Sequence, residues 1–100
     1  MNPYRNRKGE PITVEEWGRL WSDWEYRHLA EDTVGTSMVL TIWNGFSPHG
    51  MDARDTLFSS AEVRRVGDET TYGMEEWYTS EEDAIAGHRR RVEALRKAAA

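Results

Sequence analysis

Three histidines are the residues of this chain best suited to acid–base or metal chemistry, because the chain has no cysteine. His28, His49 and His88 lie far apart in the sequence, and no two of them have the spacing of a helical metal site. His88 falls on the apolar stripe of a predicted helix, where a hydrogen-bonded, half-buried histidine is the expected role. The spacing of the histidines therefore gives no indication that any of them is a catalytic base.

The remaining motifs also predict no enzyme and no cofactor. The sequence has no phosphate-binding glycine loop and no nucleophile elbow. Its glutamates come in adjacent pairs such as Glu15 and Glu16, whose side chains point to different sides of a helix or strand. His49, Asp52 and Asp55 have the chemistry of metal ligands but no diagnostic spacing. We therefore expect a non-catalytic protein without a bound metal.

Composition indicates a small intracellular domain. A chain of 100 residues buries enough surface to fold as one domain, and without cysteine it needs no oxidising compartment. No signal peptide and no apolar run of membrane-spanning length is present, so we expect a cytoplasmic protein, in the host cytoplasm if a phage encodes it. The net charge of −5 argues against a general nucleic-acid binder.

A helix is predicted at each end of the domain. Thr13 and Glu16 form a capping box, and the stripe that follows contains Trp17, Leu20, Trp21 and Trp24. Ser80 is placed as the N-cap of the second helix, whose stripe and termini agree with the helix dipole. Gly87 lies inside this helix, which indicates that the backbone there comes close to the sheet. An aromatic stripe of this kind is typical of core packing, although it also suits a partner or ligand.

Four strands are predicted between the helices. Residues 26–33 fit helix or strand, and we assign a strand from Tyr26; residues 37–43 read as a central strand. Residues 56–66 and 70–78 form a hairpin around a turn at residues 67–69. In the last strand, Tyr72, Met74 and Tyr78 are expected on one face. The fold class is α+β: a four-stranded antiparallel sheet, in the order α-β-β-β-β-α, with both helices on one face and the other face open to solvent or a partner.

Several blocks resemble a family of small uncharacterised proteins of actinobacteriophages and bacteria. Residues 78–88, YTSEEDAIAGH, are similar to its "RYSTEEEALAGH" signature, and residues 9–17, GEPITVEEW, to its "GEPITLEEW" entry. Residues 26–30, 33–35 and 39–45 follow in the order of its "YRRVA…TxVGD…VSTVWLGLDH" block. The resemblance spans most of residues 9–95 and implies a phage origin, without implying an activity. The middle departs from the family, which has an "IFETMVF" strand where this chain has residues 57–63, LFSSAEV.

The loop at residues 44–55 is the predicted binding site for a protein partner. It carries apolar side chains that a solvated loop does not need, and they either pack on the core or contact the partner. The site residues that we assign are Phe46, Pro48, His49, Met51 and Asp52. The leading hypothesis is a phage-encoded or phage-derived accessory protein that binds a host or phage protein.

Two alternatives remain at this point. Residues 1–10 are predicted to be a flexible basic tail, and residues 11–98 a single domain. In the first alternative, the protein is a regulator that contacts nucleic acid with this tail and with a second basic cluster. The residues are Arg5, Arg7, Lys8, Arg64 and Arg65, with the cluster at 89–91 as a further choice. The other alternative is a structural homo-oligomer, formed by the open sheet face or an edge strand.

Overall fold

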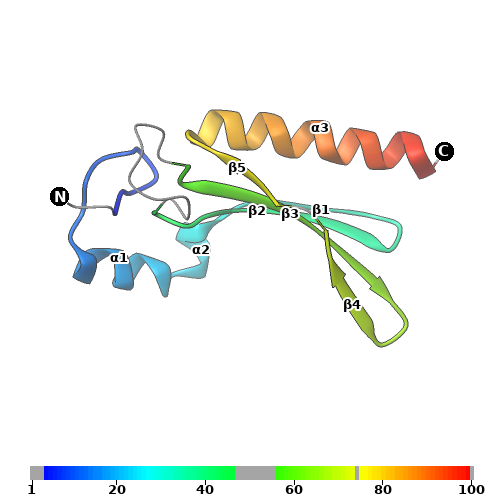
Figure 1. The fold of residues 1–100 in the computed structure, drawn as a ribbon, viewed down its shortest axis with the longest axis horizontal. Coiled ribbons are helices and arrows are strands. Elements are labelled where there is room, and N and C mark those ends of the chain that lie inside the picture. Colours follow the sequence, from blue (N-terminus) through cyan, green and yellow to red (C-terminus); the bar gives the residue numbers. More distant parts are fainter. Residues whose placement is uncertain (1–3, 47–55, 74, 100) are drawn as a thin grey trace.

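The computed structural model describes residues 4–46, 56–73 and 75–99. It shows an antiparallel sheet with helices at both ends of the chain, which confirms the predicted α+β class and element order (Figure 1). The molecule is elongated, with extents of 47 × 26 × 21 Å. The elements are α1 (Val14–Trp21), α2 (Trp24–Arg27), β1 (His28–Val34), β2 (Ser37–Trp43), β3 (Phe58–Val66), β4 (Glu69–Tyr72), β5 (Glu76–Tyr78) and α3 (Glu81–Ala99).

Both predicted helix starts are confirmed. The side chain of Thr13 accepts from the backbone N–H of Glu16 at the start of α1. The side chain of Ser80 accepts from the N–H of Asp83 at the start of α3. These local hydrogen bonds satisfy N–H groups that a helix leaves unpaired in its first turn.

The strand predicted from Tyr26 begins two residues later. Asp23 caps a short helix, α2, by accepting from the N–H of Tyr26, and β1 starts only at His28. The assignment of Tyr26 and Arg27 to a strand was therefore wrong. The hydrogen bond from the Asp23 cap stabilises a helical turn where an extended backbone was predicted. This short helix, α2, redirects the chain from α1 into the sheet.

β2 is the central strand of the sheet, between β1 and β3. Its side chains alternate regularly, and the buried set includes Val39, Thr41 and Trp43. This set faces α3, which contacts β1, β2, β3 and β5 and lies along one face of the sheet (Figure 1). The prediction placed both terminal helices on one face; α3 lies there, whereas α1 packs on α2.

α1 packs on α2 near one end of the sheet. Its Leu20 is buried, and its Trp17 packs against the same core. The buried members of this core come from the loops, the sheet and both terminal helices: Ile12, Leu20, Trp43, Leu57, Phe58 and Ala84.

The predicted fourth strand is divided into β4 and β5, which both pair with β3. Tyr72 lies opposite Val63, whereas Tyr78 lies opposite Phe58, so one extra residue is inserted between the two pairings. Such a bulge reverses the side-chain alternation. Tyr78 therefore faces α3 while Tyr72 faces the open side, and their predicted common face was wrong. Met74, the third residue of that prediction, lies outside the described residues.

Candidate functional site

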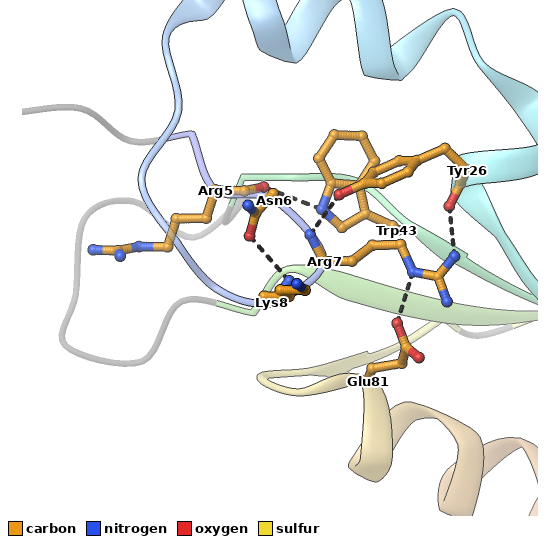
Figure 2. Close-up of polar contacts among 7 residues, drawn as sticks. All are labelled: Arg5, Asn6, Arg7, Lys8, Tyr26, Trp43 and Glu81. Carbon is orange, nitrogen blue, oxygen red and sulfur yellow. Dashed lines mark hydrogen bonds and ion pairs between the residues drawn. The ribbon is translucent and has the colours of Figure 1, made fainter.

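The N-terminal segment makes specific contacts with the domain in the described part, residues 4–10. Arg5 forms a β-bridge with Pro11, its N–H donates to the carbonyl of Gly45, and its own carbonyl accepts from the indole of Trp43 (Figure 2). Asn6 closes the turn by accepting from two backbone N–H groups, those of Lys8 and Glu10. Residues 4–10, which the sequence assigned to a flexible tail, lie against the domain in the structure because an Asx turn folds the chain back on the core.

Arg7 connects this segment to α2 and to the start of α3. Its Nε donates to Glu81 at the start of α3 over 2.6 Å, and its Nη1 donates to the carbonyl of Tyr26 over 3.0 Å (Figure 2). The backbone N–H of Arg7 also donates to the hydroxyl of Tyr26. A guanidinium with these partners has a structural role, and contact with a phosphate would require it to leave them.

The residues assigned to the nucleic-acid alternative do not form one surface. Arg5, Arg7 and Lys8 lie at the end of the molecule that carries the N-terminus, whereas Arg64 and Arg65 lie on the β3–β4 hairpin at the other end (Figure 1). Arg64 and Arg65 are neighbours on a strand and point to opposite faces of the sheet. The structure therefore lends no support to a combined basic site.

Phe46 is half-buried and makes ring contacts with three other aromatic residues. Its ring centroid lies 6.5 Å from that of Tyr4, 5.8 Å from that of Trp17 and 6.4 Å from that of Trp21. Of the two roles expected for this side chain, the contacts favour packing on the domain. Pro48, His49, Met51 and Asp52, the other residues assigned to the loop site, lie outside the described residues.

A stacked arrangement of Trp21, Arg27 and Trp24 continues this cluster toward solvent. The guanidinium carbon of Arg27 lies 3.5 Å from the ring centroid of Trp21 and 6.0 Å from that of Trp24. Arg27 also donates to the carbonyl of Trp43, and burial lowers the pKa of its guanidinium from the ordinary value. Trp24 is 51% exposed although it is a large apolar side chain.

We call this surface the aromatic patch, and we define it by Trp17, Trp21, Trp24, Arg27 and Phe46. Trp and Arg are the residue types that most often dominate the binding energy of protein interfaces. Their mutual stacking holds the side chains in place before any partner arrives, which reduces the entropy lost on binding. The sequence indicated this patch through the spacing of its tryptophans, but it did not show which of them are exposed.

A chain of polar groups, which begins at the half-exposed carboxylate of Asp32 and continues into the core, crosses the interface between α3 and the sheet. The carboxylate of Asp32 lies 2.7 Å from Nε2 of His88, whose Nδ1 lies 2.7 Å from the hydroxyl of Thr41. Thr41 in turn donates to Ser60 over 2.9 Å. The order carboxylate, imidazole, hydroxyl resembles a nucleophilic triad. However, Thr41 and Ser60 are 0% exposed, so a substrate has no access to their hydroxyl groups.

His88 is itself only 2% exposed. The contacts fit the hydrogen-bonded histidine expected from the sequence, although His88 is fully buried where a half-buried side chain was predicted. The chain of hydrogen bonds satisfies polar groups that would otherwise be buried without partners.

A second polar cluster lies where α3 passes β5. Arg91 and the hydroxyl of Tyr78 both donate to the carboxylate of Glu76, and these two hydrogen bonds lower the pKa of Glu76. Burial, followed by the hydrogen bond to Glu76, raises the pKa of Tyr78. The side chain of Glu76 is half exposed, and both of its partners bind the ionised form. The cluster therefore positions β5 against α3.

The face of the sheet opposite α3 carries a groove of about 750 Å³. Its lining includes Thr33, Met38, Val63 and Tyr72, one from each of four neighbouring strands. The β3–β4 hairpin projects away from α3 beside this groove (Figure 1). On this hairpin Tyr72 is 76% exposed and Val66 is 63% exposed.

No family model, curated protein or solved structure matches the chain. Within the described ranges, no helix is long and apolar enough to span a membrane. Histidine and carboxylate side chains of those same ranges do not gather into a group of three or more that could hold a metal ion. The actinobacteriophage resemblance stays an expectation from the sequence.

Proposed function

We propose that this protein acts by binding another protein through the aromatic patch, and that it does so without chemistry of its own. The observation that carries the proposal is the exposure of Trp24 beside the stacked pair of Trp21 and Arg27. Burying a tryptophan ring contributes a large apolar area to an interface. A phage-encoded or phage-derived accessory protein that binds a host or phage protein would fit both the patch and the resemblance of residues 9–95.

The proposed contact surface is thus the aromatic patch, whereas the sequence predicted only the loop at residues 44–55. Phe46 belongs to both, and because its ring packs on Trp17 and Trp21 we expect its removal to disturb folding as well as binding. Trp24 is the better residue for a test because its ring is half exposed.

The test compares two exposed aromatic residues at opposite ends of the molecule. Tagged parent protein, Trp24→Ser and Tyr72→Ser are used to capture proteins from an actinobacterial lysate, with mass spectrometry as the readout. The captured protein is then purified and titrated against all three by calorimetry. We expect Trp24→Ser to weaken binding by about 30-fold, the loss typical of an interface hot spot, while Tyr72→Ser binds like the parent.

Equal binding by the parent and Trp24→Ser would refute the aromatic patch as the contact surface. If the lysate yields no protein that the parent retains specifically, the proposed function itself loses its support. Thermal unfolding of each variant checks that a loss of binding does not come from a loss of folding.

A further inference from the structure

β4 is an edge strand whose outer backbone groups are available for pairing. It ends the strand order β1-β2-β3-β4, and its four residues are all exposed. The N–H of Gly73 donates to the carbonyl of Glu62 on β3. The N–H of Arg65 on β3 donates to the carbonyl of Thr36, on the side of β2, and therefore does not face β4. Since hydrogen-bonded pairs alternate in an antiparallel ladder, the N–H groups of Thr70 and Tyr72 point away from β3 toward the open edge.

The two edges of the sheet differ in how they are protected against pairing. Proteins usually block an edge with charges, proline or a bulge. β1 carries adjacent carboxylates, Glu31 and Asp32, and self-pairing about its centre would place Glu31 opposite Glu31 of another copy. β4 has the sequence ETTY, in which the one charged residue, Glu69, stands at the first position and the bulge follows Tyr72. Of these two strands, β4 is therefore the one that can pair with a second copy about its centre without opposing like charges.

We propose that a second copy of this chain pairs with β4 in an antiparallel two-fold arrangement centred on Thr71. A two-fold axis perpendicular to the sheet keeps the same face of each copy on the same side, so residues that lie opposite must share a face. Centring the pair on Thr71 puts Thr70 of one copy opposite Tyr72 of the other. Both residues have outward N–H and C=O groups, so these pairs form the new hydrogen bonds.

The side chains also fit this register. Tyr72 lies on the open face with Thr70, and pairing an aromatic with a β-branched residue across strands is favourable. Thr71 lies opposite Thr71, which is also a favourable pair, and no two charges of like sign are directly opposed. The pairing would cover part of Tyr72, which is 76% exposed in the single chain.

The resulting dimer joins two sheets into one continuous sheet. β4 is short, and an interface between four-residue strands is small, so the dimer should be weak and depend on concentration. The aromatic patch lies at the other end of the molecule, so each copy would keep its patch accessible (Figure 1). This inference therefore stands independently of the proposed function.

The test is sedimentation of the full chain over a wide range of concentrations, combined with amide hydrogen exchange. The weight-average mass should rise from 11.6 kDa toward twice that value. Exchange at Thr70 and Tyr72 should slow as the concentration rises. Exchange at Glu69 and Thr71 should not, because their N–H groups already face β3 in the single chain.

Two variants act on the edge without removing an apolar core residue. Thr70→Pro deletes an outward N–H, and Thr71→Lys places two positive charges opposite each other at the axis. Each should raise the dimer dissociation constant at least about tenfold, whereas Thr33→Lys on β1 serves as the matched control with the same change of charge. Far-UV circular dichroism confirms that the variants are folded.

Three results would overturn the proposal. A mass of one chain up to millimolar concentration would exclude the dimer. A dimer weakened equally by Thr33→Lys and Thr71→Lys would depend on net charge and not on the β4 edge. Concentration-dependent protection of β1 amides instead of Thr70 and Tyr72 would place the interface at the opposite edge.

Discussion

Gly87 provides the sharpest test of how α3 packs on the sheet. A Cβ atom built at this position would overlap Oη and Cζ of Tyr78 and lie 2.7 Å from its Cε1. Tyr78 is half-buried and donates to Glu76 over 2.8 Å. A Gly87→Ala substitution therefore displaces the ring of Tyr78 and weakens or breaks its hydrogen bond to Glu76.

The expected magnitude is the sum of opposing effects. Replacing glycine by alanine inside a helix ordinarily stabilises by about 1 kcal/mol. Overpacking costs roughly 1–3 kcal/mol, and loss of the Tyr78 hydrogen bond costs about 1 kcal/mol more. We expect a net destabilisation of about 2 kcal/mol, which lowers the melting temperature of a domain of this size by roughly 10 °C.

The measurement is thermal and urea unfolding of a set of variants. Gly18→Ala in α1 is the matched control, because a Cβ there meets no heavy atom within 4 Å. This control should raise the melting temperature by roughly 4–8 °C. In a Tyr78→Leu background the overlapping ring is absent, so Gly87→Ala should become stabilising. A Gly87→Ala protein that melts above the parent, as Gly18→Ala should, would refute the close approach of α3 to β5.

Two further predictions concern polar contacts. Arg7→Ala removes the hydrogen bonds to Glu81 and to the carbonyl of Tyr26, so it should lower the free energy of unfolding in urea by about 1–2 kcal/mol. Lys8 is exposed, and Lys8→Ala should change the same quantity by less than about 0.5 kcal/mol. Equal effects of the two substitutions would contradict the anchoring role of Arg7. Because the pKa of Glu76 is lowered by folding, its contribution is present above the ordinary value of 4.5 and is lost as pH falls through the lowered value. The stability difference between the parent and Glu76→Gln should therefore be larger at pH 7 than at pH 3, and a difference independent of pH would speak against the ion pair with Arg91.

Helix starts and the central strand were predictable because their signals are local. Thr13 and Ser80 satisfy N–H groups only three residues away, and β2 was predicted over its full length, Ser37–Trp43. The close approach at Gly87 was also predictable, since a helical glycine on an apolar face suggests a neighbouring backbone or ring.

The contacts that define the candidate surfaces depend on residues far apart in the chain. Phe46 meets Tyr4 and Trp17 only after the N-terminal segment folds back. Arg7 finds Glu81 74 positions later in the chain. No pattern within a window of residues contains such pairings, and a run of polar residues at a terminus is typical of a tail.

By itself, the sequence determined the α+β class and the order of the main elements. These features follow from periodicity and capping, which are properties of neighbouring residues. Only the tertiary structure decided that Trp24 is exposed, that one extra residue places Tyr72 and Tyr78 on opposite faces, and that β4 has an open edge. Exposure and register depend on what other elements cover or pair with a residue, and that is settled only when distant parts of the chain come together.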